Sequence, residues 1–267
     1  MTPNLELLRA KKAFICDMDG VIYHGNALID RAAEFVSWLL SEGKEFLFLT
    51  NSAERTPREL SQKLARMGLS VDESHFYTSA LATASFLRSQ CHGGSVYVIG
   101  EPALTLALYE AGFSMNDVSP DYVVFGETRS LGYDKIARAV KLIEGGARLI
   151  GTNPDLTCPT EHGIAPACRA MIAPIELTTG KSAYYIGKPN PLMMRHALKK
   201  LCCHRADAAI IGDRMDTDII AGLESELDTV LVLTGVSTKQ SIERFPYRPT
   251  YVLQNVGEIP TSKKESL

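Results

Sequence analysis

Two carboxylates, Asp17 and Asp19, directly follow a short apolar segment near the start of the chain. The segment, residues 14–16, is predicted to be a buried strand, and Gly20 follows the second carboxylate. In open α/β sheets, ligands bind beyond the carboxyl ends of the strands. Because successive strand side chains point to opposite faces, the two carboxylates take different roles only if the chain bends, which Gly20 permits. We predict that Asp17 is a nucleophile and that Asp19 carries a proton.

Three later predicted strands also end in polar residues. These residues are Thr50 and Asn51, then Lys188, then Asp213 with the nearby Asp218. The carboxyl ends of parallel strands meet at one edge of a sheet, so we expect these side chains to converge. Carboxylates beside a lysine and a hydroxyl indicate a hard cation such as Mg²⁺ and an anionic oxygen ligand. This combination fits phosphoryl transfer, in which positioning and charge neutralisation supply most of the catalysis.

The elements that position the first two groups alternate regularly. We predict a strand at 14–16, a flap at 21–29, a helix at 32–40, a strand at 45–49 and a helix from 57. The first helix has an apolar stripe, and Asp30 is placed to cap it. Thr56 and Glu59 have the spacing of a capping box for the second. The chain therefore opens as β-α-β-α.

A second run of alternating strands and helices begins near residue 80. We predict strands at 95–99, 122–125 and 148–151, helices at 102–111 and 133–144, and a loop at 152–168. This block is long enough for a small α/β domain. The first pattern then resumes, with strands at 184–187, 208–212, 229–233 and 251–253 and with helices ending near 201 and covering 218–223.

Composition narrows the class of protein. The 267 residues are 45% hydrophobic and 22% charged, as in ordinary globular proteins, and the formal net charge of −3 argues against a general nucleic-acid surface. The six cysteines show no C-x-x-C spacing, which favours reduced thiols in a cytosolic protein. No stretch reaches the ~18 apolar residues of a membrane helix, and the N-terminus lacks a hydrophobic signal core. We expect a cytoplasmic protein without a membrane or a nucleic acid polymer as partner.

The polar strand ends match a known set of ordered motifs. Asp17-Met18-Asp19-Gly20, Thr50-Asn51, Lys188, and Gly212-Asp213 with Asp218 resemble the four motifs of the haloacid-dehalogenase-like phosphatases. Five longer motifs look like their NagD-like branch: Tyr23-His24-Gly25, Leu49-Thr50-Asn51-Ser52, Gly151-Thr152-Asn153-Pro154-Asp155, Ile186-Gly187-Lys188-Pro189 and Gly212-Asp213-Arg214-Met215-Asp216-Thr217-Asp218. The resemblance runs from about residue 11 to residue 258.

The resemblance implies a covalent mechanism. Asp17 would attack phosphorus and form an aspartyl-phosphate. Asp19 would protonate the leaving oxygen and then activate the water that hydrolyses the intermediate. Thr50 and the Asn51 amide would hold phosphate oxygens. Lys188 would neutralise charge on Asp17 and on the phosphate.

The resemblance also implies a Mg²⁺ site and a substrate-binding set. Asp17, the backbone carbonyl of Asp19, and Asp213 would hold the ion. Asp218 would be oriented towards the water shell of the ion. The implied substrate-binding residues are Asp17, Gly20, Thr50, Asn51, Asn153, Asp155 and Lys188.

The fold implied by the resemblance is α/β with two domains. Residues 1–80 and 184–267 would form a Rossmann-like catalytic core with a mostly parallel sheet. Residues 81–183 would form a smaller inserted α/β cap domain that determines substrate specificity. Asn153, Pro154 and Asp155 would lie on a cap loop that faces the substrate.

The sequence departs from the NagD-like pattern in three places. Asp30-Arg31 stands where Pro-Gly is usual, and Ser225-Glu226 stands where a helix usually ends in Ala-Gly. A non-glycine residue in a left-handed cap costs about 1–2 kcal/mol, so we expect an effect on local stability. Cys168-Arg169 replaces residues that are often small, which bears on the specificity of the cap.

Other functions remain as alternatives. Alone, Asp-x-Asp-Gly is usually a turn and Lys188 a solvated helix start, but their occurrence together in order favours catalysis. A dehalogenase would not need Asp19, and a non-catalytic phospholigand-binding protein is the alternative from another class. For the small phosphomonoester substrate we expect nucleoside monophosphates first, then sugar phosphates, phosphoglycolate or pyridoxal phosphate. A homo-oligomeric state is left open.

Overall fold

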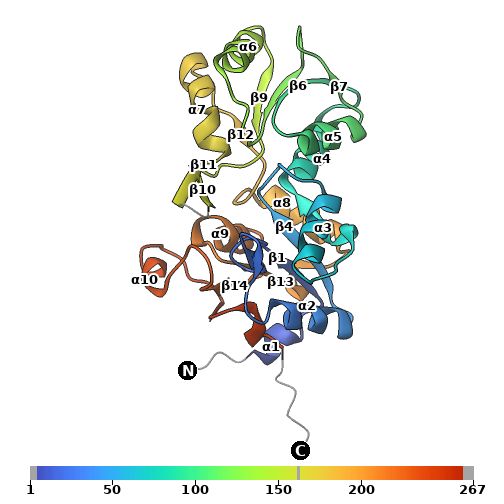
Figure 1. Ribbon diagram of the computed structural model, residues 1–267, viewed down its shortest axis with the longest axis vertical. Helices are drawn as coiled ribbons and strands as arrows, with labels where there is room; N and C mark the ends of the chain where they lie inside the picture. Colours follow the sequence, from blue (N-terminus) through green and yellow to red (C-terminus); the bar gives the residue numbers. More distant parts are fainter. Residues whose placement is uncertain (1–4, 161–162, 261–267) are drawn as a thin grey trace, which may run out of the picture. The chain divides into compact units, whose positions relative to one another are not determined.

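The computed structural model describes residues 5–160 and 163–260, and its contacts divide the chain into two compact units. The first unit comprises Met1–Leu49, Ser61–Phe76 and Met194–Leu267, and the second comprises Thr50–Leu60 and Tyr77–Met193. Each unit contains its own parallel sheet flanked by helices (Figure 1). The α/β class predicted from the sequence is confirmed, with a mostly parallel sheet and a second, smaller one. The domain boundaries at 80/81 and 183/184 stay a prediction.

A six-stranded sheet organises the first unit. Its strand order is β15-β14-β13-β1-β4-β5, with β1 (Ala13–Cys16), β4 (Glu45–Thr50), β5 (Phe76–Thr78), β13 (Ala208–Gly212), β14 (Asp228–Val232) and β15 (Tyr251–Leu253). Strand β1 is parallel to both of its neighbours, so Phe14 lies opposite Phe46 on one side and Ala209 on the other. All four residues of β1 are buried, as expected for a central strand covered on both faces.

Aromatic packing attaches α2 (Ala32–Ser41) to the central strand. The ring of Phe14 on β1 meets Phe35 and Trp38 of the helix edge to face, with centroids 6.3 and 5.6 Å apart. The expected cap is wrong: the residue before the helix is Arg31, with φ of 59°, and no side chain caps the first turn. Asp30 therefore lies one residue too early.

Two of the three departures from the family pattern occur at left-handed backbone positions. Arg31 has φ of 59° and Glu226 has φ of 57°. Glu226 follows α9 (Ile220–Glu224) at the end of its helix, where the pattern has glycine. The local strain expected at Glu226 from the sequence is thus present in the backbone conformation.

Several further elements surround the first sheet. The predicted flap is a small hairpin of β2 (Tyr23–His24) and β3 (Ala27–Leu28). Two short helices also belong to the first unit: α1 (Glu6–Arg9) precedes β1, and α10 (Lys239–Ile242) lies between β14 and β15 in the sequence. Helices α3 (Pro57–Arg66) and α8 (Pro191–Lys200) run across the division between the units in sequence. The capping box of α3 is confirmed, because Glu59 N donates to Thr56 Oγ1 at 3.2 Å and Thr56 N donates to Glu59 Oε2 at 2.8 Å.

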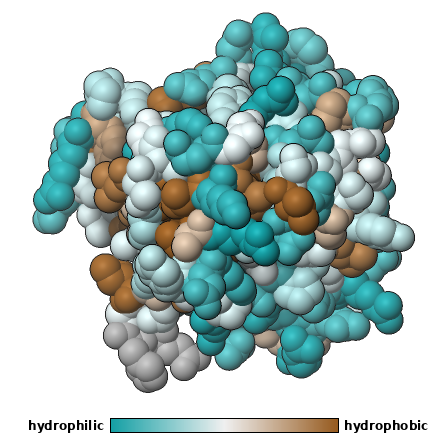
Figure 2. All heavy atoms as spheres, turned by 90° about the horizontal axis from the view of Figure 1, so that it is seen from above, coloured by the Kyte–Doolittle hydropathy of each residue, from teal (hydrophilic) through white to brown (hydrophobic). Residues whose placement is uncertain are grey.

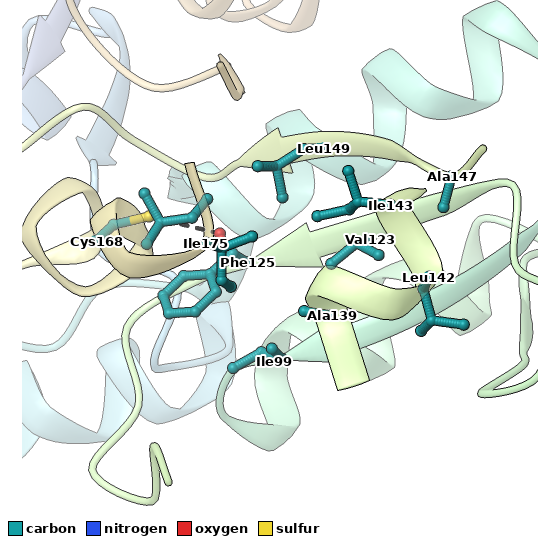
Figure 3. Packing of buried hydrophobic residues seen from close by; sticks show 11 residues of the cluster. Ile99, Val123, Phe125, Ala139, Leu142, Ile143, Ala147, Leu149, Cys168 and Ile175 are labelled. Carbon is teal, nitrogen blue, oxygen red and sulfur yellow. Dashed lines mark hydrogen bonds between the residues drawn. The ribbon is translucent and has the colours of Figure 1, made fainter. Parts of the chain in front are cut away.

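A five-stranded parallel sheet organises the second unit. Its order is β12-β9-β8-β6-β7, with β6 (Ser95–Ile99), β7 (Ser114–Met115), β8 (Tyr122–Phe125), β9 (Arg148–Gly151) and β12 (Tyr184–Tyr185). Helices α6 (Tyr133–Glu144) and α7 (Cys168–Thr179) cover one face, and α4 (Ser79–Gln90) and α5 (Pro102–Glu110) lie on the other side (Figure 1). The core under α6 and α7 is closely packed around Phe125, Ile143 and Ile175 (Figure 3).

The structure differs from the predicted elements in several places. The expected loop at 152–168 contains a hairpin of β10 (Thr157–Thr160) and β11 (Gly163–Pro166), whose mostly exposed strands lack the apolar alternation of a core strand. Helix α7 was not predicted, since Pro174 lies inside it. The strand expected at 184–187 within the resumed first pattern is the shorter β12, which pairs with β9 in the second sheet. The helix expected from Asp218 begins earlier, with a π-helical turn at Met215–Ile219.

The surface combines polar and apolar side chains. Figure 2 shows hydrophobic residues scattered in small patches among hydrophilic ones on the face it displays. The exposed apolar residues include Val118, Tyr133, Ile164 and Leu177. In the part of the chain that the structure describes, no helix has the length and apolar character to span a bilayer.

Candidate active site

Three carboxylates meet at the carboxyl edge of the first sheet. Oxygens of Asp17, Asp213 and Asp218 all lie within 4.8 Å of one another. Asp17 follows β1, Asp213 follows β13, and these strands are parallel neighbours in the sheet. Asp218 lies in the π-helical turn after β13. The sequence predicts that these three carboxylates lie at one edge of the sheet, and the structure places them together.

Backbone groups and glycines fix the Asp213 carboxylate. Its Oδ2 accepts a 2.7 Å hydrogen bond from the Val236 backbone N–H, and the residue is 3% exposed. A β-carbon on Gly20 would lie 2.7 Å from Oδ2, and one on Gly235 would overlap the same carboxylate. Gly20 also has φ of 77°, so this turn requires glycine for both its conformation and its space. Thr234 Oγ1 holds the turn by donating to the Gly20 carbonyl at 2.6 Å.

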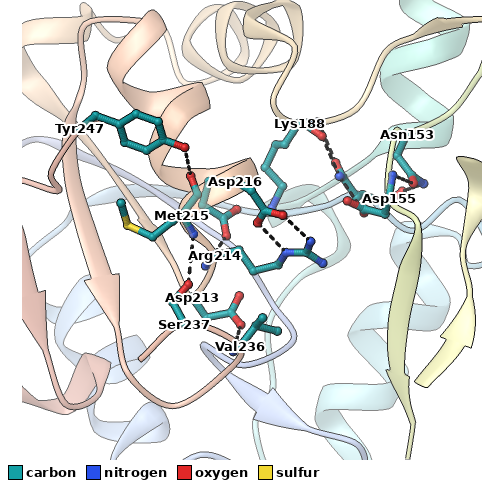
Figure 4. Close-up of polar contacts among 12 residues, drawn as sticks. Asn153, Asp155, Lys188, Asp213, Arg214, Met215, Asp216, Val236, Ser237 and Tyr247 are labelled. Carbon is teal, nitrogen blue, oxygen red and sulfur yellow. Dashed lines mark hydrogen bonds and ion pairs between the residues drawn. The ribbon is translucent and has the colours of Figure 1, made fainter. Parts of the chain in front are cut away.

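The buried Asp218 carboxylate is held in a similar way. Its Oδ2 accepts a 3.1 Å hydrogen bond from the Arg214 backbone N–H, and a β-carbon on Gly212 would overlap its side chain. Arg214 in turn forms a two-point ion pair with Asp216, with N–O distances of 3.1 and 2.9 Å (Figure 4). The Tyr247 hydroxyl donates to the Met215 carbonyl at 3.0 Å and anchors the same turn (Figure 4).

The cluster has the donor chemistry of a site for a hard divalent cation. Carboxylate oxygens are the ligands that Mg²⁺ prefers, with a few carboxylates and waters completing its shell. Three carboxylates side by side, with Asp213 and Asp218 buried and Asp17 half-buried, are unfavourable unless a cation compensates their charge. The glycines Gly20, Gly212 and Gly235 provide the close approach that this arrangement needs. The residues present thus fit a Mg²⁺ ion.

The side chain of Asp19 is not part of this carboxylate cluster, and its environment differs. Its side chain is 49% exposed, and its Oδ1 lies 3.5 Å from Nδ1 of His24 in the flap. Burial of part of the group raises the pKa of the Asp19 carboxyl, and the charges of His24 and Lys63 oppose this rise. The raised pKa favours the protonated form, which is the form that a general acid needs.

In the second unit, Asn51 is bonded to the backbone of Lys188. Asn51 Oδ1 accepts from Lys188 N at 2.8 Å, and Asn51 Nδ2 donates to the Lys188 carbonyl at 3.0 Å. The same Nδ2 donates to Asp155 Oδ2 at 3.0 Å. Lys188 is only 2% exposed. The side-chain amide of Asn51 therefore fixes the position of the Lys188 backbone and of the Asp155 carboxylate.

Asn153 is a buried part of the same network. Its Nδ2 donates to the Asn51 carbonyl at 2.8 Å, and its Oδ1 accepts from Asp155 N at 3.1 Å (Figure 4). A β-carbon on Gly187 would lie 2.7 Å from Asn51 Oδ1 and 2.8 Å from the Asn153 side chain, so glycine is needed for the close packing. Thr50, at the end of β4, accepts a 3.1 Å hydrogen bond from Ser52 N. The substrate-binding roles predicted for these residues stay predictions.

Two site residues, Gly235 and Glu127, were not singled out from the sequence. Gly235 packs against Asp213. Glu127 accepts a 2.5 Å hydrogen bond from Asn153 Nδ2, and burial raises the pKa of its carboxyl to about 7. A signal for Glu127 existed, because it follows the buried strand β8 as Asp17 follows β1.

Comparisons with known proteins agree with the arrangement of the motifs. The family model described as haloacid dehalogenase-like hydrolase matches residues 14–114, and a model described as HAD-hydrolase-like matches residues 185–259. The solved structure of NagD from Escherichia coli K-12 superposes with a TM-score of 0.89 at 43% identity and covers 94% of this chain and 99% of that chain.

Three phosphatases are similar over nearly the whole sequence. Dihydroxyacetone phosphatase of Corynebacterium glutamicum is 46% identical over 247 residues, which are 92% of this chain and 90% of that protein. Ribonucleotide monophosphatase NagD of Escherichia coli is 44% identical over 248 residues, 93% of this chain and 98% of that protein. Acid sugar phosphatase of Staphylococcus saprophyticus is 38% identical over 249 residues, 93% of this chain and 96% of that protein.

Proposed function

The chain belongs to the haloacid dehalogenase-like hydrolases, in their NagD-like branch, and we propose that it is a Mg²⁺-dependent phosphatase with an aspartyl-phosphate intermediate. The family and the phosphatases among its relatives make it a phosphomonoester hydrolase that acts on small phosphates. The observation that carries the finer proposal is the cluster of Asp17, Asp213 and Asp218.

The proposed reaction assigns one step to each carboxylate of the first motif. Asp17 attacks phosphorus and releases the alcohol, and Asp19 supplies the proton that the leaving oxygen takes up. Asp19 then removes a proton from the water that cleaves the acyl-phosphate bond. The raised pKa of Asp19 supports the first of its two tasks.

Phosphate binding is assigned to Thr50, the Asn51 backbone amide and Lys188, with Gly20 leaving room at the acidic turn. The hydrogen bonds between Asn51 and both backbone groups of Lys188 support this assignment, since they fix the lysine before substrate arrives. Asn153 and Asp155 are proposed to act from the cap loop. Asp155 accepts from the Asn51 side chain and so connects that loop to the phosphate-binding residues.

The metal site is assigned to Asp17, the Asp19 carbonyl and Asp213, with Asp218 acting through a water. When bound, Mg²⁺ neutralises charge on the phosphate oxygens. Asp213 is positioned for this role by the Val236 N–H. Asp218 is positioned by the Arg214 N–H.

For the substrate, we propose nucleoside monophosphates first. The relative NagD is named a ribonucleotide monophosphatase, which supports this choice. The second candidate is a small sugar or triose phosphate, favoured by the relatives named dihydroxyacetone phosphatase and acid sugar phosphatase. We further propose that residues 81–183 act as the cap, and that the protein works in the cytoplasm, where its six free thiols are stable. Membranes and nucleic acid polymers are not expected partners.

A phosphate-release panel with and without Mg²⁺ tests the proposal. It contains nucleoside monophosphates, dihydroxyacetone phosphate, glucose 6-phosphate, phosphoglycolate and pyridoxal phosphate. We expect turnover that EDTA abolishes and the highest kcat/KM for a nucleoside monophosphate. A preference for dihydroxyacetone phosphate would replace the substrate proposal. Ligand-protected thermal stability without turnover on any compound would favour a phospholigand-binding protein.

A further inference from the structure

We propose that Glu127 is a positioning residue for phosphate binding: it holds Asn153, and through Asn153 it holds the backbone of Asn51, whose side chain fixes Lys188. The inference rests on the proposed function, because it concerns the residues assigned to the phosphate. All four residues belong to the second unit.

The first link is the hydrogen bond between Glu127 and Asn153. Asn153 Nδ2 carries two hydrogens, and its two shortest bonds go to Glu127 Oε1 at 2.5 Å and to the Asn51 carbonyl at 2.8 Å. Asn153 Oδ1 accepts from Asp155 N. The amide of Asn153 is fully buried and engaged at both ends, so its orientation is fixed. Without Glu127, one of its buried N–H groups would lose its acceptor.

The second link runs from Asn153 to Lys188. The Asn51 side chain accepts from the N–H of Lys188 and donates to its carbonyl. The Asn51 carbonyl also accepts from Ser79 Oγ at 2.5 Å, so two side chains hold the same backbone group. The fit is close, since a β-carbon on Gly187 would lie within 3 Å of both Asn51 and Asn153. A displacement of Asn153 is therefore transmitted to Asn51.

The Glu127 carboxyl is buried, and one of its two oxygens has no hydrogen-bond partner among the described residues. Among residues 5–160 and 163–260, no group forms a hydrogen bond with its buried Oε2. Burial raises the pKa of this carboxyl to about 7, and the nearby carboxylates Asp155 and Glu54 act in the same direction. Cys158 and Cys168 are the other titratable groups that face it. Burying an acid is unfavourable for folding unless it is hydrogen-bonded, and the bond from Asn153 Nδ2 supplies such a partner.

Steady-state kinetics with p-nitrophenyl phosphate and Mg²⁺ test the proposal. We expect Glu127→Ala to lower kcat/KM at least tenfold, because small displacements of binding groups reduce rates strongly. Glu127→Gln keeps an acceptor for Asn153 and should stay within threefold of the wild type. Glu127→Asp, which withdraws the acceptor without removing the acid, should be intermediate and serves if the alanine variant does not fold.

Two controls separate positioning from a general loss of structure. Glu176 accepts hydrogen bonds from Ala183 N at 2.7 Å and from the Tyr185 hydroxyl at 3.2 Å in the same unit, so Glu176→Ala removes a comparable structural acceptor. It should leave kcat/KM unchanged. Adding Glu127→Ala to Asn153→Ala should cause no further loss, because Glu127 acts through Asn153.

Binding of inorganic phosphate, measured by calorimetry with Mg²⁺ present, tests the link without turnover. We expect Glu127→Ala to weaken phosphate binding at least tenfold and Glu127→Gln to preserve it. Wild-type protein that binds phosphate but turns over no substrate would contradict the proposed function only. Unchanged kcat/KM and phosphate affinity in Glu127→Ala and Glu127→Asp, or equal losses in Glu176→Ala, would overturn the role of Glu127.

Discussion

A β-carbon on Gly20 would lie 2.7 Å from Oδ2 of Asp213, although 193 residues separate the two positions in the sequence. The same Oδ2 accepts the Val236 N–H at 2.7 Å. The glycine of the first motif therefore sets the space available to the carboxylate of the last. This relationship connects the turn that carries Asp17 and Asp19 to the proposed metal site.

Replacing Gly20 should impair metal binding. Gly20→Ala places a methyl group against Asp213 and strains a backbone with φ of 77°, so we expect the Mg²⁺ concentration for half-maximal activity to rise at least tenfold. A Mg²⁺ titration of phosphate release measures it. Gly25→Ala is the matched control, since Gly25 has φ of 57° and no atom within 4 Å of the added β-carbon. An equal Mg²⁺ requirement in both variants would show that backbone strain alone explains the effect.

Removing the Asn51 side chain should impair phosphate binding. Asn51→Ala deletes the bonds that hold both backbone groups of Lys188, and we expect kcat/KM to fall about 100-fold, of the order reported for misplaced catalytic groups. Asn116→Ala is the control, because the Asn116 side chain also bonds backbone groups through both its oxygen and its nitrogen but lies in an exposed loop. Wild-type kinetics for Asn51→Ala would contradict the positioning of Lys188 by this amide.

Glycine at position 226 should stabilise the fold. Glu226 occupies a left-handed conformation with φ of 57°, and relief of that strain in Glu226→Gly is worth about 1 kcal/mol after the entropic cost of glycine. Its exposed ion pair with Arg205 contributes little. Thermal unfolding should show a Tm a few degrees higher with activity unchanged. Glu224→Gly, at the last residue of the adjacent helix α9, relieves no left-handed strain and should not raise the Tm.

The buried Glu127 should make stability depend on pH. Its folded pKa is raised from 4.5 to about 7, so the folded state binds more protons than the unfolded state between these values. The free energy of unfolding therefore falls as pH rises through this window, by about 3 kcal/mol for a change of this size. Urea denaturation at pH 5 and pH 8 should show this loss in the wild type and not in Glu127→Gln. Parallel pH dependence in the two proteins would contradict the raised pKa.

The buried strands were the elements that the sequence predicted most accurately. Strands 95–99, 122–125, 148–151, 208–212 and 251–253 and helix 133–144 have the predicted bounds. The strands are short, mostly apolar runs between turn residues, and the helix has an apolar stripe with helical spacing. The exposed hairpin β10–β11 has no apolar face to reveal it. Helix α7 contains Pro174, and its stability comes from tertiary packing of Cys168, Ile172 and Ile175.

The sequence predicted the candidate site residues that directly follow a strand. Asp17 and Asp213 are such residues, and the structure clusters them with Asp218. Gly235 and Glu127 were missed because their importance arises from contacts distant in sequence, to Asp213 and to Asn153. A glycine that makes room for a carboxylate leaves no local pattern, and the place of Glu127 after strand β8 does not reveal that it orients the Asn153 amide.

The turnover of Asp17→Asn measures the central claim, that Asp17 is the nucleophile, most directly. Asparagine preserves the size of the side chain but cannot form an acyl-phosphate by the proposed route. With p-nitrophenyl phosphate and saturating Mg²⁺, we expect kcat to fall at least 1,000-fold at an unchanged circular dichroism spectrum, in the range of nucleophile removal. Asp30→Asn, which alters an exposed carboxylate outside the Asp17, Asp213 and Asp218 cluster, should retain full activity. Asp17→Asn protein with wild-type turnover would contradict the account.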